Sequence, residues 1–296
     1  VIFDKNKQCL FFARDQLGIK PLYYSDQNGN FAFSSELKPL FNFPFIDKKI
    51  DKNAIAEFLL NTFLYEPDTG FENVFKLVPG HKMVYDLTTK TKTIECYWDP
   101  INIKVNKHST QNLKELISNT ITNHLVSDVP VGLFFSGGVD STLLLNNIKQ
   151  DITSFCVNPG ENELKNAGFE NDVFYARKIA DKLNKPLTEI SLNSSLSKQE
   201  FLNELDSIVN SIEEPTSCYT FASSQRLAEV AHKKKFKVML SGMGADEIFY
   251  GYTRYKLVAY ARLFKPFVKI INLLFKNTKN FSKKIERFNS FFNKKS

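Results

Sequence analysis

Hydrophobic and polar residues alternate differently in the two parts of the chain. In residues 1–98, short runs rich in aromatic and β-branched residues are separated by turn residues, which is typical of antiparallel strands. Asn28-Gly29 lies between two aromatic runs and predicts a tight hairpin. The pattern predicts strands over residues 1–3, 9–13, 22–24, 31–34 and 82–86, and a helix over residues 52–61.

From about residue 111, helical patterns alternate with strand patterns along the chain. This alternation favours a parallel sheet covered by helices. Residues 99–110 lack a clear period and are interpreted as a linker, so we expect a β-rich domain over 1–98 and an α/β domain over 111–296. The predicted helices cover 112–125, 141–149, 172–183, 198–212 and 219–233, and the predicted strands cover 132–135, 153–157, 187–191 and 236–240.

The composition, with 43% hydrophobic and 24% charged residues, excludes a collagen-like or wholly disordered chain. No run approaches eighteen apolar residues, so no membrane span is expected. Residues 255–296 carry eleven lysines and arginines against one acid, whereas the rest is slightly acidic, so no nucleic-acid partner is expected. This tail is either a basic amphipathic segment for a membrane or acidic partner, or a helix pair with a solvated lysine face.

The cysteines and histidines are dispersed. Without a C-x-x-C pair or a Cys/His cluster, neither a zinc site nor a redox dithiol is expected. Buried free thiols in a cytoplasmic protein are the simpler interpretation. The chain begins with Val1 inside a strand pattern, which suggests a segment of something longer. The residues concerned are Cys9, Cys96, Cys156, Cys218, His81, His108, His124 and His232.

The strongest chemical signal is SGGVDS, residues 136–141, directly after an apolar strand. A strand that turns through two glycines into a helix exposes backbone N–H groups that can cradle a phosphate. Asp140 would repel that anion unless a cation lay between them, which suggests Mg²⁺. The spacing and lysine of a Walker A loop are absent. The alternative is a tight turn with a serine N-cap.

A second glycine-punctuated loop, SGMGAD at 241–246, follows the predicted strand 236–240. Ligands of parallel sheets bind beyond the carboxyl ends of the strands. Two such loops, carrying Asp140 and Asp246, can therefore face each other across one metal ion. The alternative for Asp246 and Glu247 is a solvated helix N-terminus.

Several segments together resemble glutamine-dependent asparagine synthetases. HLVSDVPVGLFFSGGVDS (124–141) and LSGMGADEIFYGY (240–252) resemble motifs of the synthetase domain. ARDQLGIKPLYY (13–24), FSSELKPL (33–40) and VPGH (78–81) resemble the end of the glutaminase domain. The resemblance implies an α/β fold class. A remnant of an N-terminal-nucleophile glutaminase sandwich would precede a parallel-sheet ATP-pyrophosphatase domain of the adenine nucleotide alpha-hydrolase type.

The resemblance also implies an activity. ATP would adenylate a carboxylate, most simply that of aspartate, and glutamine-derived ammonia would displace AMP after pyrophosphate had left. The implied ligands are these small molecules and Mg²⁺, with a homodimer as a candidate assembly. The implied site residues are Phe134 and Val157 at the adenine; Ser136, Gly137, Gly138, Asp140 and Ser141 at the pyrophosphate; Ser241 and Gly242 near the nucleotide; Asp140 and Asp246 at the metal; Asp140, Asp246 and Glu247 in catalysis; and Asp15 at the glutamine amino group.

The sequence departs from the family pattern in three places. No cysteine stands at the N-terminus, and Cys9 lies within a strand, so the chain as given is not expected to hydrolyse glutamine. Met243 replaces a glutamate (aspartate in some members) that lies near the reacting centre, and Glu247 and Glu214 are the nearest substitutes. Family members also continue into a helical region with a catalytic lysine that has no match here.

Two other functions follow from these departures. One is a relative that amidates another carboxylate, such as a sugar acid or a peptide, or closes a ring. The other is a non-catalytic scaffold, although the intact loop at 136–141 argues against decay. Glu213-Glu214-Pro215 resembles a family segment near the acceptor pocket or a helix-ending turn, and Arg14 is expected to pair with a carboxylate.

Overall fold

A computed structural model describes residues 1–103, 110–158, 172–191, 197–217, 220–253 and 255. The chain falls into two compact units. The basic tail 256–296, most of the expected linker, Cys218 and His108 lie outside the described residues. No helix among the described residues is long and apolar enough to cross a membrane. The first unit comprises Val1–Thr120, Val157–Gly168 and Ile190–Lys234, and the second comprises Ile121–Cys156, Phe169–Glu189 and Lys235–Ser296.

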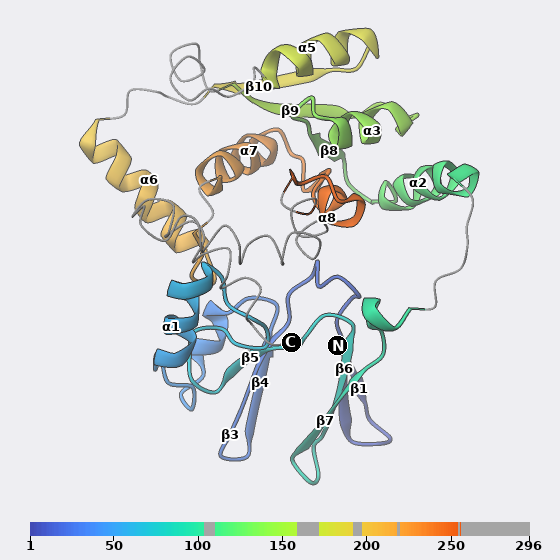
Figure 1. The fold of residues 1–296 in the computed structure, drawn as a ribbon. Coiled ribbons are helices and arrows are strands. Elements are labelled where there is room, and N and C mark those ends of the chain that lie inside the picture. Colours follow the sequence, from blue (N-terminus) through green and yellow to red (C-terminus); the bar gives the residue numbers. More distant parts are fainter. Residues whose placement is uncertain (104–109, 159–171, 192–196, 218–219, 254, 256–296) are drawn as a thin grey trace, which may run out of the picture. The chain divides into compact units, whose positions relative to one another are not determined.

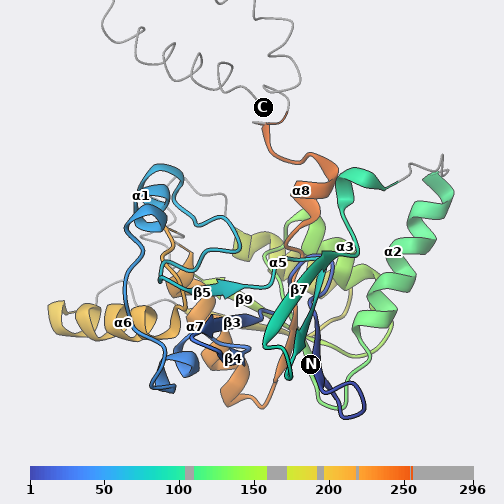
Figure 2. The same cartoon turned by 90° about the horizontal axis from the view of Figure 1, so that it is seen from below.

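The first unit contains two antiparallel sheets (Figures 1 and 2). The hairpin expected at Asn28-Gly29 is confirmed, with φ of 54° and 72° at its two turn residues. One sheet has the order β1 (Ile2–Asp4), β2 (Cys9–Ala13), β6 (His81–Asp86), β7 (Thr91–Cys96), and the other has the order β4 (Asn30–Ser34), β3 (Tyr23–Gln27), β5 (Val74–Lys76).

Aromatic side chains join these two sheets. Phe12 on β2 is fully buried, and its ring centroid lies 5.7 Å from that of Phe31 on β4. Phe31 in turn stacks on Tyr85 of β6 at 4.1 Å. Burying rings of this size contributes a large part of the hydrophobic stabilisation of a small domain. The packing between the sheets agrees with the sandwich that the family resemblance implies for this part of the chain.

Two strands of this unit were not predicted. All six residues of β7 are exposed, so the strand has no buried face to produce an alternation of apolar and polar residues. Its place is fixed instead by pairing along β6, from His81 opposite Cys96 to Asp86 opposite Thr91. β5 has only three residues, and a run that short carries little periodic signal.

The helices of the described chain begin and end near the predicted positions. α1 has the predicted bounds, and the other long helices differ by a few residues at their ends. The two short 3₁₀ helices were not predicted, and α8 corresponds to the helix N-terminus given only as the alternative for Asp246 and Glu247. The helices are η1 (Lys38–Asn42), α1 (Lys52–Asn61), η2 (Pro100–Asn102), α2 (Thr110–His124), α3 (Val139–Asn147), α5 (Asp172–Lys182), α6 (Lys198–Ser211), α7 (Phe221–Lys233) and α8 (Ala245–Phe249).

Asp51→Ala should lower the free energy of unfolding by about 1 kcal/mol. The Asp51 carboxylate accepts hydrogen bonds from the backbone N–H groups of Asn53 and Ala54, which the helix α1 leaves without partners. Urea denaturation of the variant and of a control, Asp47→Ala, checks the expectation. Equal losses in the two variants would contradict the capping role.

The four-stranded sheet β10-β9-β8-β11 lies mainly in the second unit, and only the last two residues of β9 and of β10 are assigned to the first (Figure 1). β8 pairs in parallel with both β9 and β11, as the alternating pattern predicts. Leu133 on β8 and Phe155 on β9 are fully buried at the centre of this sheet. Strands that are buried on both faces carry continuous apolar sequences, as β8 does. The mixed α/β class is therefore confirmed. The strands are β8 (Val131–Phe134), β9 (Thr153–Asn158), β10 (Leu187–Ser191) and β11 (Val238–Leu240).

Three cysteines are described, and none of them is in a disulfide within the described part of the chain. Cys156 is buried, and burial raises the pKa of its thiol to about 12. Cys9 is half-buried. Cys96 is exposed at the end of the edge strand β7, so the expectation of burial is wrong for this residue.

Candidate functional site

The loop between β8 and α3 is held together by its own hydroxyl groups. The backbone N–H of Gly138 donates to Ser136 Oγ at 3.3 Å, and Ser141 Oγ donates to the Gly138 carbonyl at 3.2 Å. The two serine oxygens lie 3.3 Å apart. Gly138 is the N-cap of α3 and makes no side-chain cap, so the turn with a serine N-cap is not formed. Asp140 and Ser141 consequently lie in the first helical turn.

The first glycine of this loop is required by its surroundings. Gly137 has a φ of +78°, and a Cβ placed there would lie 2.6 Å from the backbone nitrogen of Ala176 on α5. The φ of Gly138 is −68°, and an added Cβ would meet only Ser136 Oγ, at 3.3 Å. Gly137 therefore lets α5 approach the loop, whereas a side chain at Gly138 would meet only the Ser136 hydroxyl, which accepts the Gly138 N–H.

The second glycine loop lies against the first. A Cβ added to Gly242 would come within 3.1 Å of both Asp140 Cβ and the Ser141 nitrogen. The two loops follow β8 and β11, which are neighbours in the parallel sheet. The expected meeting of these loops at the carboxyl edge of the sheet is therefore observed, although their roles toward a ligand stay predictions.

Met243 lies at the tip of this second loop. Its side chain is 91% exposed, while its backbone N–H donates to Ser241 Oγ at 3.3 Å. Gly244 follows with a φ of +96° and no heavy atom within 4 Å of an added Cβ. The position that carries a carboxylate in the resembled family thus holds an exposed, uncharged side chain beside open space.

The charges around Asp140 favour a cation. Its pKa is raised by burial, and then by the negative charges of Asp246 and Glu247. Glu247 accepts a hydrogen bond from the Tyr252 hydroxyl at 2.8 Å. Within the described residues no group of three or more His, Cys, Asp or Glu could form a metal cage. Mg²⁺ commonly binds through one or two carboxylates plus substrate phosphates, and Asp140 and Asp246 fit that kind of site.

The two positions assigned to the adenine lie on neighbouring strands. Phe134 is the last residue of β8 and Val157 lies near the end of β9, and both are half-buried. Ser241 is exposed just after β11. These places agree with a ligand at the strand ends, but contact with adenine stays a prediction.

Asp15, the residue expected to bind glutamine, belongs to the first unit. Its carboxylate accepts hydrogen bonds from the backbone N–H groups of Ile19 at 2.9 Å and Lys20 at 3.0 Å. Burial raises the pKa of Asp15, but the hydrogen bonds from Lys20, Ile19 and Leu17 outweigh it and leave the pKa below its ordinary value. Asp15 is therefore held as an anion, which suits a group that binds an amino group.

Two residues named as substitutes for the missing glutamate have different surroundings. Glu247 interacts electrostatically with Asp140 in the second unit. Glu214 belongs to the first unit, where it forms an ion pair with Lys76 and accepts a hydrogen bond from Tyr23. Glu247 therefore acts on Asp140 of the first glycine loop, whereas the contacts of Glu214 lie within the first unit. The contacts of Tyr252 and Tyr23 were not predicted, because nothing in the local sequence signals them.

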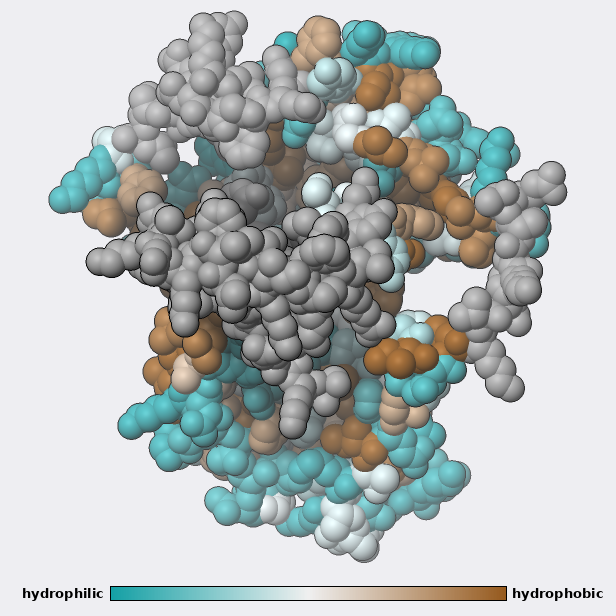
Figure 3. All heavy atoms as spheres, viewed as in Figure 1, coloured by the Kyte–Doolittle hydropathy of each residue, from teal (hydrophilic) through white to brown (hydrophobic). Residues whose placement is uncertain are grey.

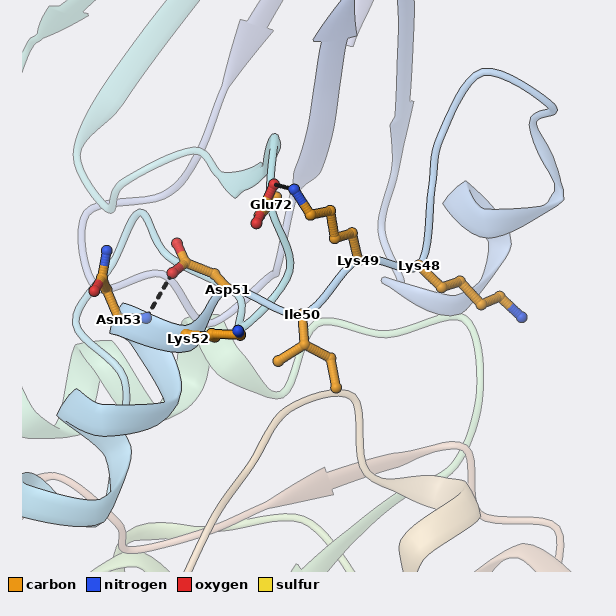
Figure 4. A pocket seen from close by; sticks show the side chains of 7 residues that line it. All are labelled: Lys48, Lys49, Ile50, Asp51, Lys52, Asn53 and Glu72. Atoms are coloured by element: carbon orange, nitrogen blue, oxygen red, sulfur yellow. Dashed lines mark hydrogen bonds and ion pairs between the residues drawn. The ribbon is translucent and has the colours of Figure 1, made fainter.

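A surface cavity of about 750 Å³ lies at the start of α1 (Figure 4). It is lined by residues 48–53 and Glu72, and includes the ion pair between Lys49 and Glu72 at 2.7 Å. Figure 4 shows Lys48 pointing away from the other side chains. Because Asp51 already occupies the N–H groups of the first helical turn, this cavity offers no prepared anion site.

Family models match both parts of the chain. A glutamine amidotransferase domain model matches residues 1–98, and the asparagine synthase model matches residues 112–295. The chain belongs to the asparagine synthase family. Within this family, residues 136–141 and 241–246 both lie in the part that the asparagine synthase model covers.

Curated members of the asparagine synthase family are similar over most of this chain. Asparagine synthetase [glutamine-hydrolyzing] 1 of Bacillus subtilis is 33% identical over 86% of the chain and 39% of its own length. A second B. subtilis asparagine synthetase is 29% identical over 92% of the chain and 38% of its own length. A putative asparagine synthetase of Methanocaldococcus jannaschii is 30% identical, over 85% and 48%. The chain thus spans less than half the length of these relatives.

Proposed function

We propose that the chain contains the nucleotide site of an ATP-dependent, amide-forming ligase, most simply an asparagine synthetase fed by glutamine. The observation that carries this proposal is the contact of Gly242 with Asp140 and Ser141, which joins two glycine loops beyond adjacent parallel strands. A site of that shape, with two aspartates and no basic residue in either loop, suits a nucleotide that arrives with Mg²⁺.

In the proposed reaction, an oxygen of the acceptor carboxylate attacks the α-phosphorus of ATP, and pyrophosphate leaves. Ammonia then attacks the acyl carbon, AMP leaves, and the nitrogen loses a proton. The N–H of Gly138 and the hydroxyl of Ser136, which are hydrogen-bonded to each other here, would turn to the departing pyrophosphate, and Asp140 and Asp246 would hold Mg²⁺. The metal neutralises phosphate charge, while the chain contributes binding and orientation of the two reactants.

Several finer assignments belong to the same proposal. Residues 1–98 would form the end of a glutaminase domain, residues 99–110 a linker, and residues 111–296 part of the synthetase domain. Asp15 would bind the amino group of glutamine. A cytoplasmic location, suggested by the separated cysteines, and a homodimer also stay predictions.

The test is an acceptor screen in the full-length natural protein that contains this chain. Pyrophosphate release is measured with ATP, Mg²⁺ and ammonia in the presence of aspartate, uronic acids or carboxyl-terminal peptides. Release with aspartate, accompanied by asparagine, supports the proposed ligase. Met243 favours a second candidate, amidation of another carboxylate. No pyrophosphate release with aspartate, together with release in the presence of another acid, would support it. No pyrophosphate release with any of these acids would favour the non-catalytic scaffold.

Met243→Glu should lower the apparent KM for ammonia by up to about fivefold, which corresponds to roughly 1 kcal/mol for an exposed charge pair. Met243 is exposed beside Gly244, so a carboxylate at this position could attract ammonium without disturbing packing. Met243→Gln has the same size without the charge and is the control. Steady-state pyrophosphate release checks the prediction, and an equal effect of the two substitutions would contradict it.

A further inference from the structure

Residues 213 and 214, in the connection between α6 and α7, are held by residues of the N-terminal part of the chain. It contains Glu213 and Glu214, which the asparagine synthase model covers, whereas their partners lie in the segment matched by the amidotransferase model. All of these residues belong to the first unit. The contacts therefore join two segments of different family origin within one compact unit.

Glu213 supplies the missing cap of a short helix. Its Oε2 accepts hydrogen bonds from the backbone N–H groups of Leu37 at 2.5 Å and Lys38 at 3.0 Å. No side chain from η1's own N-cap residue satisfies these donors. The Lys38 ammonium also donates to the Asn210 carbonyl at the end of α6. This attachment fixes where the connection leaves α6.

Glu214 continues into a line of alternating charges. Its Oε1 lies 2.6 Å from Lys76 Nζ and accepts a hydrogen bond from the Tyr23 hydroxyl at 2.8 Å. Lys76 also contacts Glu66 at 3.4 Å, and Glu66 pairs with Arg14 at 3.1 Å. The four charged side chains are at most a quarter exposed, so water screens their interactions less than on an open surface.

The line ends at the loop that holds Asp15. Arg14 donates to the carbonyl groups of Gly18 at 3.1 Å and Lys20 at 3.1 Å. These residues close the same loop whose N–H groups bind the Asp15 carboxylate. A change at Glu214 would shift Lys76 toward Glu66, weaken the hold of Glu66 on Arg14, and loosen that loop.

We propose that Lys76 and Glu214 are positioning residues that couple the glutamine-binding loop to the α6–α7 connection. Through Glu66 and Arg14, the state of one segment biases the geometry of the other. The inference rests on the proposed function, because coupling has a purpose only if glutamine hydrolysis supplies the synthetase reaction. Glu214, considered above as a substitute for the missing glutamate, is engaged here by Lys76 and Tyr23 and is therefore assigned a positioning role instead.

Glu214→Gln in the full-length natural protein tests the coupling. The ratio of ammonia-dependent to glutamine-dependent pyrophosphate release should rise roughly fivefold, because a loosened Asp15 loop binds glutamine less well. With ammonia, pyrophosphate release should stay within about twofold of wild type, because no glutamine-binding loop is needed. A merely structural role would lower both rates together and leave the ratio unchanged, which would overturn the proposal.

Two further variants guard against simple misfolding. Tyr23→Phe removes one hydrogen bond to Glu214 and keeps the buried ring, and we expect a smaller rise in the same ratio. Lys76→Met combined with Glu214→Gln should be no worse than either single change, because the pair acts as a unit. Glu72→Gln removes a carboxylate from the exposed pair with Lys49 and is the matched control. Additive effects of Lys76→Met and Glu214→Gln would contradict the proposal that both residues act through the same line of charged side chains.

Hydrogen–deuterium exchange of residues 14–20 separates this inference from the proposed function. The N–H groups of Ile19 and Lys20 should exchange several-fold faster in Glu214→Gln and at the wild-type rate in Glu72→Gln. Unchanged exchange in Glu214→Gln overturns the coupling even if the ligase reaction is observed. Faster exchange supports the physical link even if wild type releases no pyrophosphate, a result that would count against the ligase alone.

Discussion

Asp140→Ala should reduce ATP-dependent pyrophosphate release at least about 100-fold, the usual effect of removing a main electrostatic contact from an active site. Asp140 lies in the first turn of α3, and Gly242 of the second loop lies directly against it. The negative charges of Asp246 and Glu247 act on the same carboxyl group. Removing Asp140 takes one of two proposed metal ligands from the point where the loops meet.

Binding and stability must be measured separately for this variant. Titration of ATP with Mg²⁺ should show a large loss of affinity in Asp140→Ala and in the closely matched Asp140→Asn. Asp140→Asn should unfold at the same or higher urea concentration than wild type, because burial and two negative neighbours disfavour the ionised carboxyl. Asp128→Ala, which removes an exposed carboxylate from the loop before β8, is the control. Wild-type affinity in Asp140→Ala would refute the proposed site.

The fold was predictable where one face of an element is buried. α1, β2 and β10 have the predicted bounds, because each combines a regular pattern with clear turn residues at its ends. β7 could not be predicted, since all six of its residues are exposed and only pairing with β6 makes it a strand. The short helix α8 carries too few residues to show a helical period.

Surface exposure was harder to predict than the positions of helices and strands. Hydrophobic side chains remain visible among polar ones on the face in Figure 3. Val139 is 84% exposed although it opens a helix next to the buried strand β8. Its exposure follows from the N-terminal position in α3, where the chain has only just left the sheet. An apolar residue in sequence therefore indicates core only when neighbouring elements cover it.

The candidate site was predictable to the extent that it is local. The residues of each glycine loop are consecutive, so motif and strand context place them together. The neighbourhood of the two loops followed from a general rule of parallel sheets. The charged line from Arg14 to Glu214 spans two hundred residues of sequence, and no periodicity or motif links its members. Such contacts depend on tertiary packing alone.

Gly137→Ala should lower the free energy of unfolding by about 2–5 kcal/mol, the sum of strain at positive φ and of overpacking. The φ of Gly137 is +78°, a conformation that costs an L-residue about 1–2 kcal/mol. The added methyl would also lie 2.6 Å from the Ala176 nitrogen, and a backbone atom within α5 cannot move aside alone. The loop and α5 must therefore separate.

Gly244→Ala is the matched comparison, because it has the same kind of strain without the contact. Its φ is +96°, and nothing lies within 4 Å of an added Cβ, so only the conformational cost of about 1–2 kcal/mol is expected. Urea denaturation of both variants isolates the contribution of α5 as the difference between them. Equal losses would mean that α5 does not constrain the loop. A larger loss of unfolding free energy in Gly137→Ala, together with weaker binding of ATP and Mg²⁺, would show that packing against α5 maintains the shape of the loop at 136–141.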